Sequence, residues 1–131
     1  MKVLALDYGS ARTGVAVSDP TGSIARPLGV VERAALEPGL ARVAQLVATE
    51  GAERVVVGLP LTLRGERGAQ ALETERFVEA LRSALSVPVE TFDERFTTSL
   101  ANQSPAGLAP EDARAAAHLL SGYLEWSRAL R

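Results

Sequence analysis

Three short apolar segments separated by turns open this chain, before any segment of helical period appears. Residues 2–7 (KVLALD) and 14–18 (GVAVS) are strand-like runs on either side of the turn-rich YGSART, which predicts a hairpin. A third strand is expected over residues 26–32, at a sheet edge because Pro27 and Gly29 weaken its hydrogen-bond ladder. Three strands joined by short loops predict an antiparallel meander.

After the meander the apolar residues no longer alternate with polar ones, as in a strand, but recur at the spacing of a helix. Pro38 suits the first turn of a helix that ends at Gly51. The valines at 55–57 then predict a strand buried on both faces. A second helix is expected over residues 70–85. Its inward-facing residues are expected to be Leu72, Phe77, Leu81 and Leu85.

One more strand, over residues 87–93, and a last helix that starts at Pro110 complete the pattern, with a helical turn near Thr98 and a polar loop between them. The last helix is expected to bury Ala113, Ala116, Leu120, Tyr123 and Leu124. The order βββαβαβα with right-handed crossovers predicts an α/β fold with a mixed five-stranded sheet flanked by helices. Because no linker or repeat divides the chain, residues 1–131 are expected to form one domain.

The composition restricts the chemistry that this chain can support. It contains no cysteine, so a metal ion would need oxygen ligands or the single histidine, His118. The longest apolar run near the N-terminus, residues 3–6, is too short for a signal peptide or a membrane span, and we expect a cytoplasmic protein without a membrane partner. The formal net charge of −2 argues against broad, sequence-independent binding of nucleic acid.

Acidic residues end several of the expected elements. Asp7 ends the first strand near the expected centre of the sheet, where a buried carboxylate is costly unless paired or metal-bound, although it could also cap the following turn. Asp93 and Glu94 end the last strand, and only one of them can point where Asp7 points. Their alternative role is a solvated strand end paired with Arg95. Asp112 lies in the first turn of the last helix, where the helix dipole alone would stabilise it.

Acids from a central strand, a neighbouring strand and a packed helix could meet at one end of the sheet. Such carboxylates repel one another, and a divalent cation removes that repulsion. Two Mg²⁺ or Mn²⁺ ions about 3.5–4 Å apart would activate water and stabilise the leaving oxygen of a phosphodiester. The pattern therefore predicts a metal-dependent nuclease.

Glycines and cations surround these acids. Gly9 and Gly14 span the first hairpin turn in the pattern D-x-G-x-x-x-x-G, which allows positive φ and close approach of a phosphate, although tight hairpins also need glycine. Gly58 and Pro60 follow the strand expected over residues 55–57, at the edge where the strands end. Their alternative role is a plain turn from strand to loop. Arg12 and Arg95 could each hold a phosphate. The expected substrate-binding residues are Gly9, Arg12, Gly14, Gly58, Pro60, Arg95, Thr97 and Thr98.

Four stretches of this chain resemble the YqgF/RuvX family of RNase H-fold proteins, relatives of RuvC-type Holliday junction resolvases. They are LALDYGSARTGVAVSDPTGSIARPL, VVVGLPLTLRGERGAQALETERFVEAL, VETFDERFTTSLA and DARAAAHLLSGYL. The resemblance implies an RNase H-like fold with catalytic, metal-ligating acids at Asp7, Glu94 and Asp112. Gly65 also falls on a family motif position.

The resemblance implies a hydrolase that processes the 5′ end of precursor 16S rRNA during ribosome biogenesis, with the ribosome or processing machinery as partner. The competing activity is resolution of branched DNA, which needs a two-fold dimer, whereas a processing nuclease can act as a monomer or weak homodimer. A catalytically silent module that binds RNA or the ribosome is a third hypothesis. This chain has Ala11 where family members commonly have lysine, and residues 105–110 lack lysine, which should weaken binding and its salt dependence.

Overall fold

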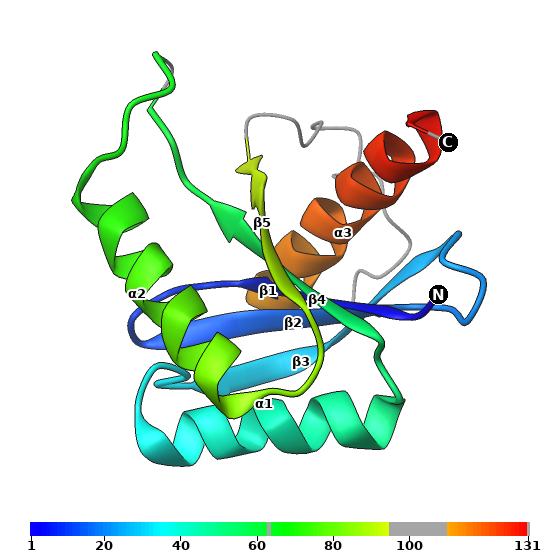
Figure 1. Ribbon diagram of the computed structural model, residues 1–131, viewed down its shortest axis with the longest axis horizontal. Coiled ribbons are helices and arrows are strands. Elements are labelled where there is room, and N and C mark those ends of the chain that lie inside the picture. The colour runs from blue at the N-terminus through cyan, green and yellow to red at the C-terminus, as the bar shows by residue number, and fades with distance from the viewer. Residues whose placement is uncertain (63, 95–109, 131) are drawn as a thin grey trace.

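A mixed sheet of five strands, in the order β3-β2-β1-β4-β5, forms the centre of the molecule (Figure 1). The computed structural model describes residues 1–62, 64–94 and 110–130. The elements are β1 (Val3–Asp7), β2 (Arg12–Ser18), β3 (Ala25–Glu32), α1 (Glu37–Glu50), β4 (Arg54–Leu59), α2 (Ala69–Ala84), β5 (Val89–Asp93) and α3 (Glu111–Ala129). This order and the mixed sheet confirm the fold class predicted from the sequence.

The central strand is β1, which pairs antiparallel with β2 and parallel with β4. β4 in turn pairs parallel with β5, and β3 is an edge strand, as Pro27 predicted. Because β1, β4 and β5 run in one direction, their carboxyl ends lie along the same edge of the sheet. Asp7 and the residues that follow β4 and β5 therefore meet at that edge.

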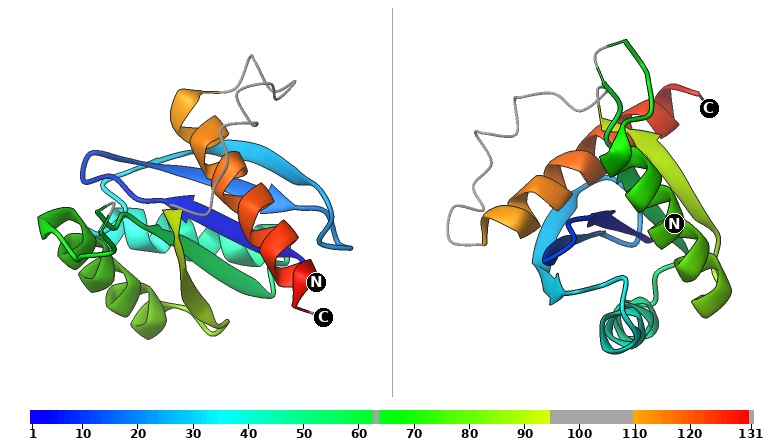
Figure 2. Two further views of the ribbon diagram at one scale, coloured as in Figure 1. Left: turned by 90° about the horizontal axis from the view of Figure 1, so that it is seen from above. Right: turned by 90° about the vertical axis from the view of Figure 1, so that its left-hand side faces the viewer.

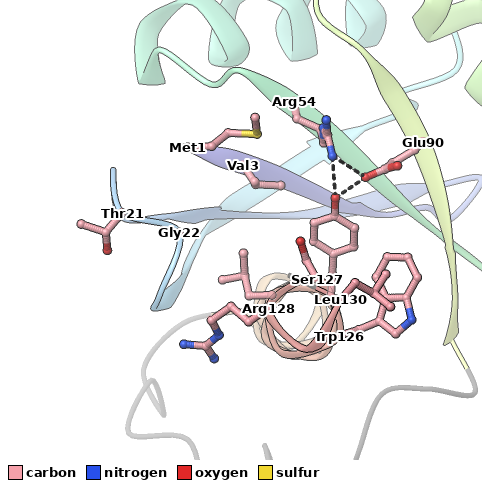
Figure 3. Close-up of a pocket in the computed structure, with 12 residues that line it drawn as sticks. Met1, Val3, Thr21, Gly22, Arg54, Glu90, Trp126, Ser127, Arg128 and Leu130 are labelled. Atoms are coloured by element: carbon pink, nitrogen blue, oxygen red, sulfur yellow. Dashed lines mark hydrogen bonds and ion pairs between the residues drawn. The ribbon is translucent and has the colours of Figure 1, made fainter.

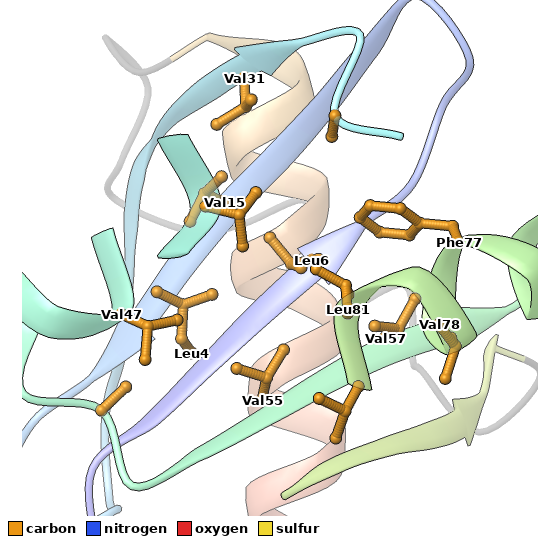
Figure 4. Packing of buried hydrophobic residues seen from close by; sticks show 14 residues of the cluster. Leu4, Leu6, Val15, Val31, Val47, Val55, Val57, Phe77, Val78 and Leu81 are labelled. Atoms are coloured by element: carbon orange, nitrogen blue, oxygen red, sulfur yellow. The ribbon is translucent and has the colours of Figure 1, made fainter. Parts of the chain in front are cut away.

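Helices cover both faces of the sheet. α1 and α2 pack together on one face, and α3 crosses the other face alone (Figure 2). Alternate residues of β1 supply both cores, with Leu4 and Leu6 pointing to the α1 and α2 side and Val3 and Ala5 to the α3 side. Figure 4 shows the larger core, in which Phe77 and its neighbours on α2 pack against the valines of the sheet. No helix in the described parts of the chain is long and apolar enough to cross a membrane.

The inward face of α2 differs from the prediction. Leu72 is 46% exposed, whereas Phe77 and Leu81 are buried and Leu85 packs against the core. Leu72 and Phe77 are five positions apart in the sequence, which places them about 140° apart around the helix. The residues that α2 does bury are Ala71, Thr74, Phe77, Val78 and Leu81.

The last helix buries the residues that its spacing predicted. It begins one residue later than expected, because Pro110 has an extended backbone and serves as the N-cap. The helical turn expected near Thr98 and the polar loop after it lie outside the described residues.

Candidate functional site

Asp7 and Glu94 meet across the end of β4. Asp7 is the last residue of β1, Glu94 directly follows β5, and their side chains are hydrogen-bonded to each other. A Cβ added at Gly58 of β4 would lie 2.7 Å from Oε1 of Glu94 and 3.0 Å from Cδ2 of Leu119. The missing side chain at position 58 therefore leaves the space through which Glu94 reaches Asp7.

Both carboxyl groups have a raised pKa. Burial is the largest cause of the raised pKa of Asp7, and the charge of Asp112 adds to it. Burial and then the charge of Asp7 raise the pKa of Glu94 to about 7, with a smaller effect from Asp93. When Glu94 is protonated, its carboxyl group donates a hydrogen bond to the Asp7 carboxylate. Ionisation of both groups is unfavourable unless a cation balances their charges.

Asp112 lies on the opposite side of Asp7 from Glu94, against the face of β2 that α3 covers. A Cβ added at Gly14 would lie 1.8 Å from the carbonyl oxygen of Asp112, so the first turn of α3 rests directly on the backbone of β2. Gly14 is the antiparallel partner of Asp7. Gly14 and Gly58 therefore lie on either side of Asp7. The space at Gly58 holds the Glu94 side chain, and the space at Gly14 holds the backbone of Asp112.

The side chain of Asp112 is paired with an arginine. Nε of Arg12 lies 3.2 Å from Oδ2 of Asp112, and the two side chains are 67% and 37% exposed. Among the residues that the structure describes, no three His, Cys, Asp or Glu side chains converge closely enough to hold a metal ion. The structure thus joins Asp7 to Glu94 and places Asp112 beside them with its carboxylate turned to Arg12.

This set of donors fits a hard divalent cation. All three side chains offer carboxylate oxygen, the ligand that Mg²⁺ and Mn²⁺ prefer. Two of them are already in contact in the cradle that Gly58 leaves open, although their charges repel. The third, Asp112, is paired with Arg12.

The first loop uses its glycines differently from the prediction. Neither Gly9 nor Gly14 has a positive φ. A Cβ at Gly9 would lie 2.4 Å from the carbonyl oxygen of Arg12, and the space above Gly14 is filled by α3, so both positions serve close packing of the backbone. Thr13, which the sequence did not single out, is buried, and its hydroxyl donates to the Gly9 carbonyl at 3.3 Å. The sequence analysis placed Thr13 in the turn YGSART, so its burial on β2 was not expected.

The remaining predicted residues lie along or beyond the same edge. Pro60 is half-buried just after β4, at the start of a hairpin closed by a bridge between Leu61 and Arg67. Gly65 has a φ of 80° in the turn of that hairpin, a value that favours glycine. Arg95, Thr97 and Thr98 lie outside the described residues.

A pocket of about 410 Å³ lies at the opposite end of the sheet, where β4 begins (Figure 3). Arg54 donates hydrogen bonds to Oε1 of Glu90 at 3.2 Å and to the Tyr123 hydroxyl at 3.0 Å. The Tyr123 hydroxyl also donates to Glu90. None of the three predicted acids lines this pocket.

Comparison with known proteins places the chain in a sequence family. Residues 1–126 match the family model described as RuvX: Holliday junction resolvase. A protein from Chloroflexus aurantiacus named "Putative pre-16S rRNA nuclease" is 46% identical over 134 residues, covering 96% of this chain and 88% of the relative. A protein of the same name from Syntrophomonas wolfei is 36% identical over 133 residues, covering 95% and 94%.

Solved structures share the fold. RuvC of Thermus thermophilus in complex with a Holliday junction substrate has a TM-score of 0.68 at 20% identity, covering 98% of this chain and 96% of RuvC. The fowlpox virus resolvase in complex with Holliday junction DNA has a TM-score of 0.56 at 11% identity, with 97% and 99% coverage. At these identities the likeness concerns the fold alone, and it confirms the predicted RNase H-like architecture.

Proposed function

Because this chain belongs to the RuvX family, we propose that it is a nuclease that hydrolyses phosphodiester bonds of structured nucleic acid. The names of its relatives favour precursor 16S rRNA as the substrate, cut near its 5′ end during ribosome biogenesis. Residues 1–131 act as one catalytic domain, in the cytoplasm and with the ribosome or its processing machinery as partner.

The contact between Asp7 and Glu94 is the observation that carries this proposal. Both half-buried carboxyl groups have a raised pKa, and their contact destabilises the fold once both are ionised. Folding alone gives no reason to place them there. Strongly perturbed acids of this kind concentrate at functional sites.

Asp7, Glu94 and Asp112 would hold Mg²⁺ or Mn²⁺, in a two-metal arrangement. When bound, the ions supply an activated water and stabilise the leaving oxygen. The protein's own part is to keep the Asp7 and Glu94 oxygens in contact. Gly58 contributes by leaving the space for Glu94.

Substrate contacts in this proposal are local, because the net charge of −2 gives no general attraction for nucleic acid. Arg12 is largely exposed beside Asp112 and can hold a phosphate with two hydrogen bonds. Gly9, Gly14, Gly58 and Pro60 shape the surface on which the nucleic acid would lie. We retain Arg95, Thr97 and Thr98 as proposed contacts from the sequence.

Resolution of Holliday junctions is the second candidate function, favoured by the description of the matching family model. A resolvase cuts two strands symmetrically and therefore acts as a two-fold dimer. The precursor-RNA nuclease needs no dimer, and we propose a monomer or weak homodimer. The mass of the protein in solution, alone and with a four-way DNA junction, distinguishes the two functions.

Cleavage assays in Mn²⁺ test the proposed site directly, with a 5′-extended precursor RNA and a four-way DNA junction as substrates. We expect the wild type to cleave the RNA and Asp7→Asn or Glu94→Gln to lose at least about 10³-fold of the rate. Asp93→Asn is the matched control, since it removes an equal charge from the adjacent position and should keep most of the rate.

Each other result points to a different conclusion. Equal cleavage by wild type and Asp7→Asn would exclude this site. Cleavage of the junction in preference to the RNA would favour the resolvase. Binding of the RNA without cleavage by any variant would favour the silent binding module.

A further inference from the structure

We infer that Arg12 competes with the metal ion at this site, since its guanidinium group pairs with Oδ2 of Asp112, an oxygen that a divalent cation would also bind. The freed side chain then binds a phosphate of the nucleic acid. This inference rests on the proposed metal-dependent nuclease and assigns Arg12 two alternative partners within it.

The fold itself creates the pairing of Arg12 with Asp112. Arg12 and Gly14 are two residues apart on β2, so both face the side of the sheet that α3 covers. The close approach of the Asp112 carbonyl to Gly14 fixes the first turn of α3 directly above this part of β2. Nε of Arg12 and Oδ2 of Asp112 are then 3.2 Å apart.

The guanidinium group of Arg12 is the cationic partner of the Asp112 carboxylate. A divalent cation that binds all three acids therefore competes with this guanidinium group for Asp112. Asp112 can leave Arg12 at modest cost, because the ion pair is partly open to water.

Once released from Asp112, the Arg12 side chain can turn towards solvent. Its side chain is 67% exposed, and a cation bound by the acids would repel it. A guanidinium group beside the metal ligands is well suited to grip the phosphate of the substrate with two hydrogen bonds. Binding of metal therefore prepares the site for its substrate.

Replacing Arg12 should change the affinities for metal and for nucleic acid in opposite directions. Arg12→Gln removes the competitor for Asp112, and we expect Mn²⁺ to bind about two- to fivefold more tightly, as befits a partly exposed ion pair. The same change should weaken binding of nucleic acid and lower its salt dependence by about one phosphate contact. A purely structural role for Arg12 would weaken both.

The affinity for Mn²⁺ can be measured by electron paramagnetic resonance without any nucleic acid. The comparison needs the wild type, Arg12→Gln, Arg12→Lys, Asp112→Asn and the double variant. Arg12→Lys keeps the ion pair and should stay close to the wild type. Arg42→Gln is the matched control, because Arg42 is an exposed arginine on α1 that bonds only to Gln45 among the described residues.

We expect Arg12→Gln to tighten binding in the wild-type background and to have no effect in the Asp112→Asn background. A gain that persists without Asp112 would overturn the inference, since Arg12 would then act only through its general charge. Unchanged Mn²⁺ affinity in Arg12→Gln, with weaker binding in Asp112→Asn, would overturn it and leave the proposed site intact. Absence of Mn²⁺ binding by the wild type would instead overturn the proposed metal site, and the inference with it.

Discussion

Two polar clusters lie at opposite ends of the same sheet, and they are built on opposite electrostatic rules. The arginine cluster, Arg54 with Glu90 and Tyr123, pairs a cation with an acid and a hydroxyl at the start of β4 (Figure 3). The carboxylate cluster, Asp7 with Glu94 and the neighbouring Asp112, gathers acids at the end of β1 and β5. The first links α3 to β4 and β5 through favourable pairs, whereas the second costs stability, a cost that the proposed metal site would explain.

The largest expected effect comes from separating Asp112 from the carboxylate cluster. In Gly14→Ala the new Cβ would overlap the Asp112 carbonyl oxygen, so α3 must shift outward. We expect a loss of about 3 kcal/mol in the free energy of unfolding, or roughly 10 °C in Tm, together with loss of cleavage. Thermal unfolding followed by circular dichroism measures the first effect.

Gly29→Ala is the matched control for this change. Gly29 also lies within the meander, on β3, but a Cβ there meets nothing within 4 Å. The variant should unfold at the temperature of the wild type and keep its cleavage. Equal melting temperatures for the two alanine variants would contradict the close contact between α3 and β2.

Neutralising Glu94 is expected to raise the free energy of unfolding, by less than Gly14→Ala lowers it. Its pKa is raised from 4.5 to about 7, so the folded chain binds more protons than the unfolded chain between these values. Stability of the metal-free wild type should therefore fall as pH rises through this range. Glu94→Gln should remove that fall and be more stable than the wild type at pH 8 by about 1 kcal/mol, since the pair is partly open to water.

Melting temperatures at pH 5 and pH 8, in the presence of a chelator, measure this difference. At pH 5 the Glu94 carboxyl is protonated, and the variant should match the wild type. A Glu94→Gln protein that is less stable than the wild type at pH 8 would remove the electrostatic contrast between the two clusters.

The smallest effect is expected in the arginine cluster. Glu90→Gln takes away the negative partner of Arg54 but keeps an oxygen that can accept hydrogen bonds. We expect a loss of about 0.5–1 kcal/mol, because Arg54 and Glu90 are partly exposed, with no change in cleavage or in Mn²⁺ affinity. A loss of cleavage on this substitution would show that the two ends of the sheet are coupled.

Most of the fold followed from periodicity, because burial repeats at fixed intervals in helices and strands. Ala116 and Leu120 of α3 lie four residues apart and both are buried, as predicted. Leu72 was expected on the inward face of α2, but its angle around the helix turns it to solvent. The helical spacing between Leu72 and Phe77 accounts for this difference.

The meeting of Asp7 with Glu94 was also predictable, since parallel strands end at one edge of a sheet. The roles of Gly14 and Gly58 were not, because they depend on how α3 docks and on where the Glu94 side chain turns. The pairing of Arg12 with Asp112 depends on the same docking. Sequence spacing contains no information about the angle at which a helix crosses a sheet.

The docking of α3 onto β2 also has a consequence for the order in which the molecule acquires activity. All five strands and the first two acids are present once residue 94 has been synthesised, but the α3 side of the sheet is then bare. The helix that covers this face also delivers Asp112. A growing chain therefore gains the third acid of the proposed site in the same step that completes its second core.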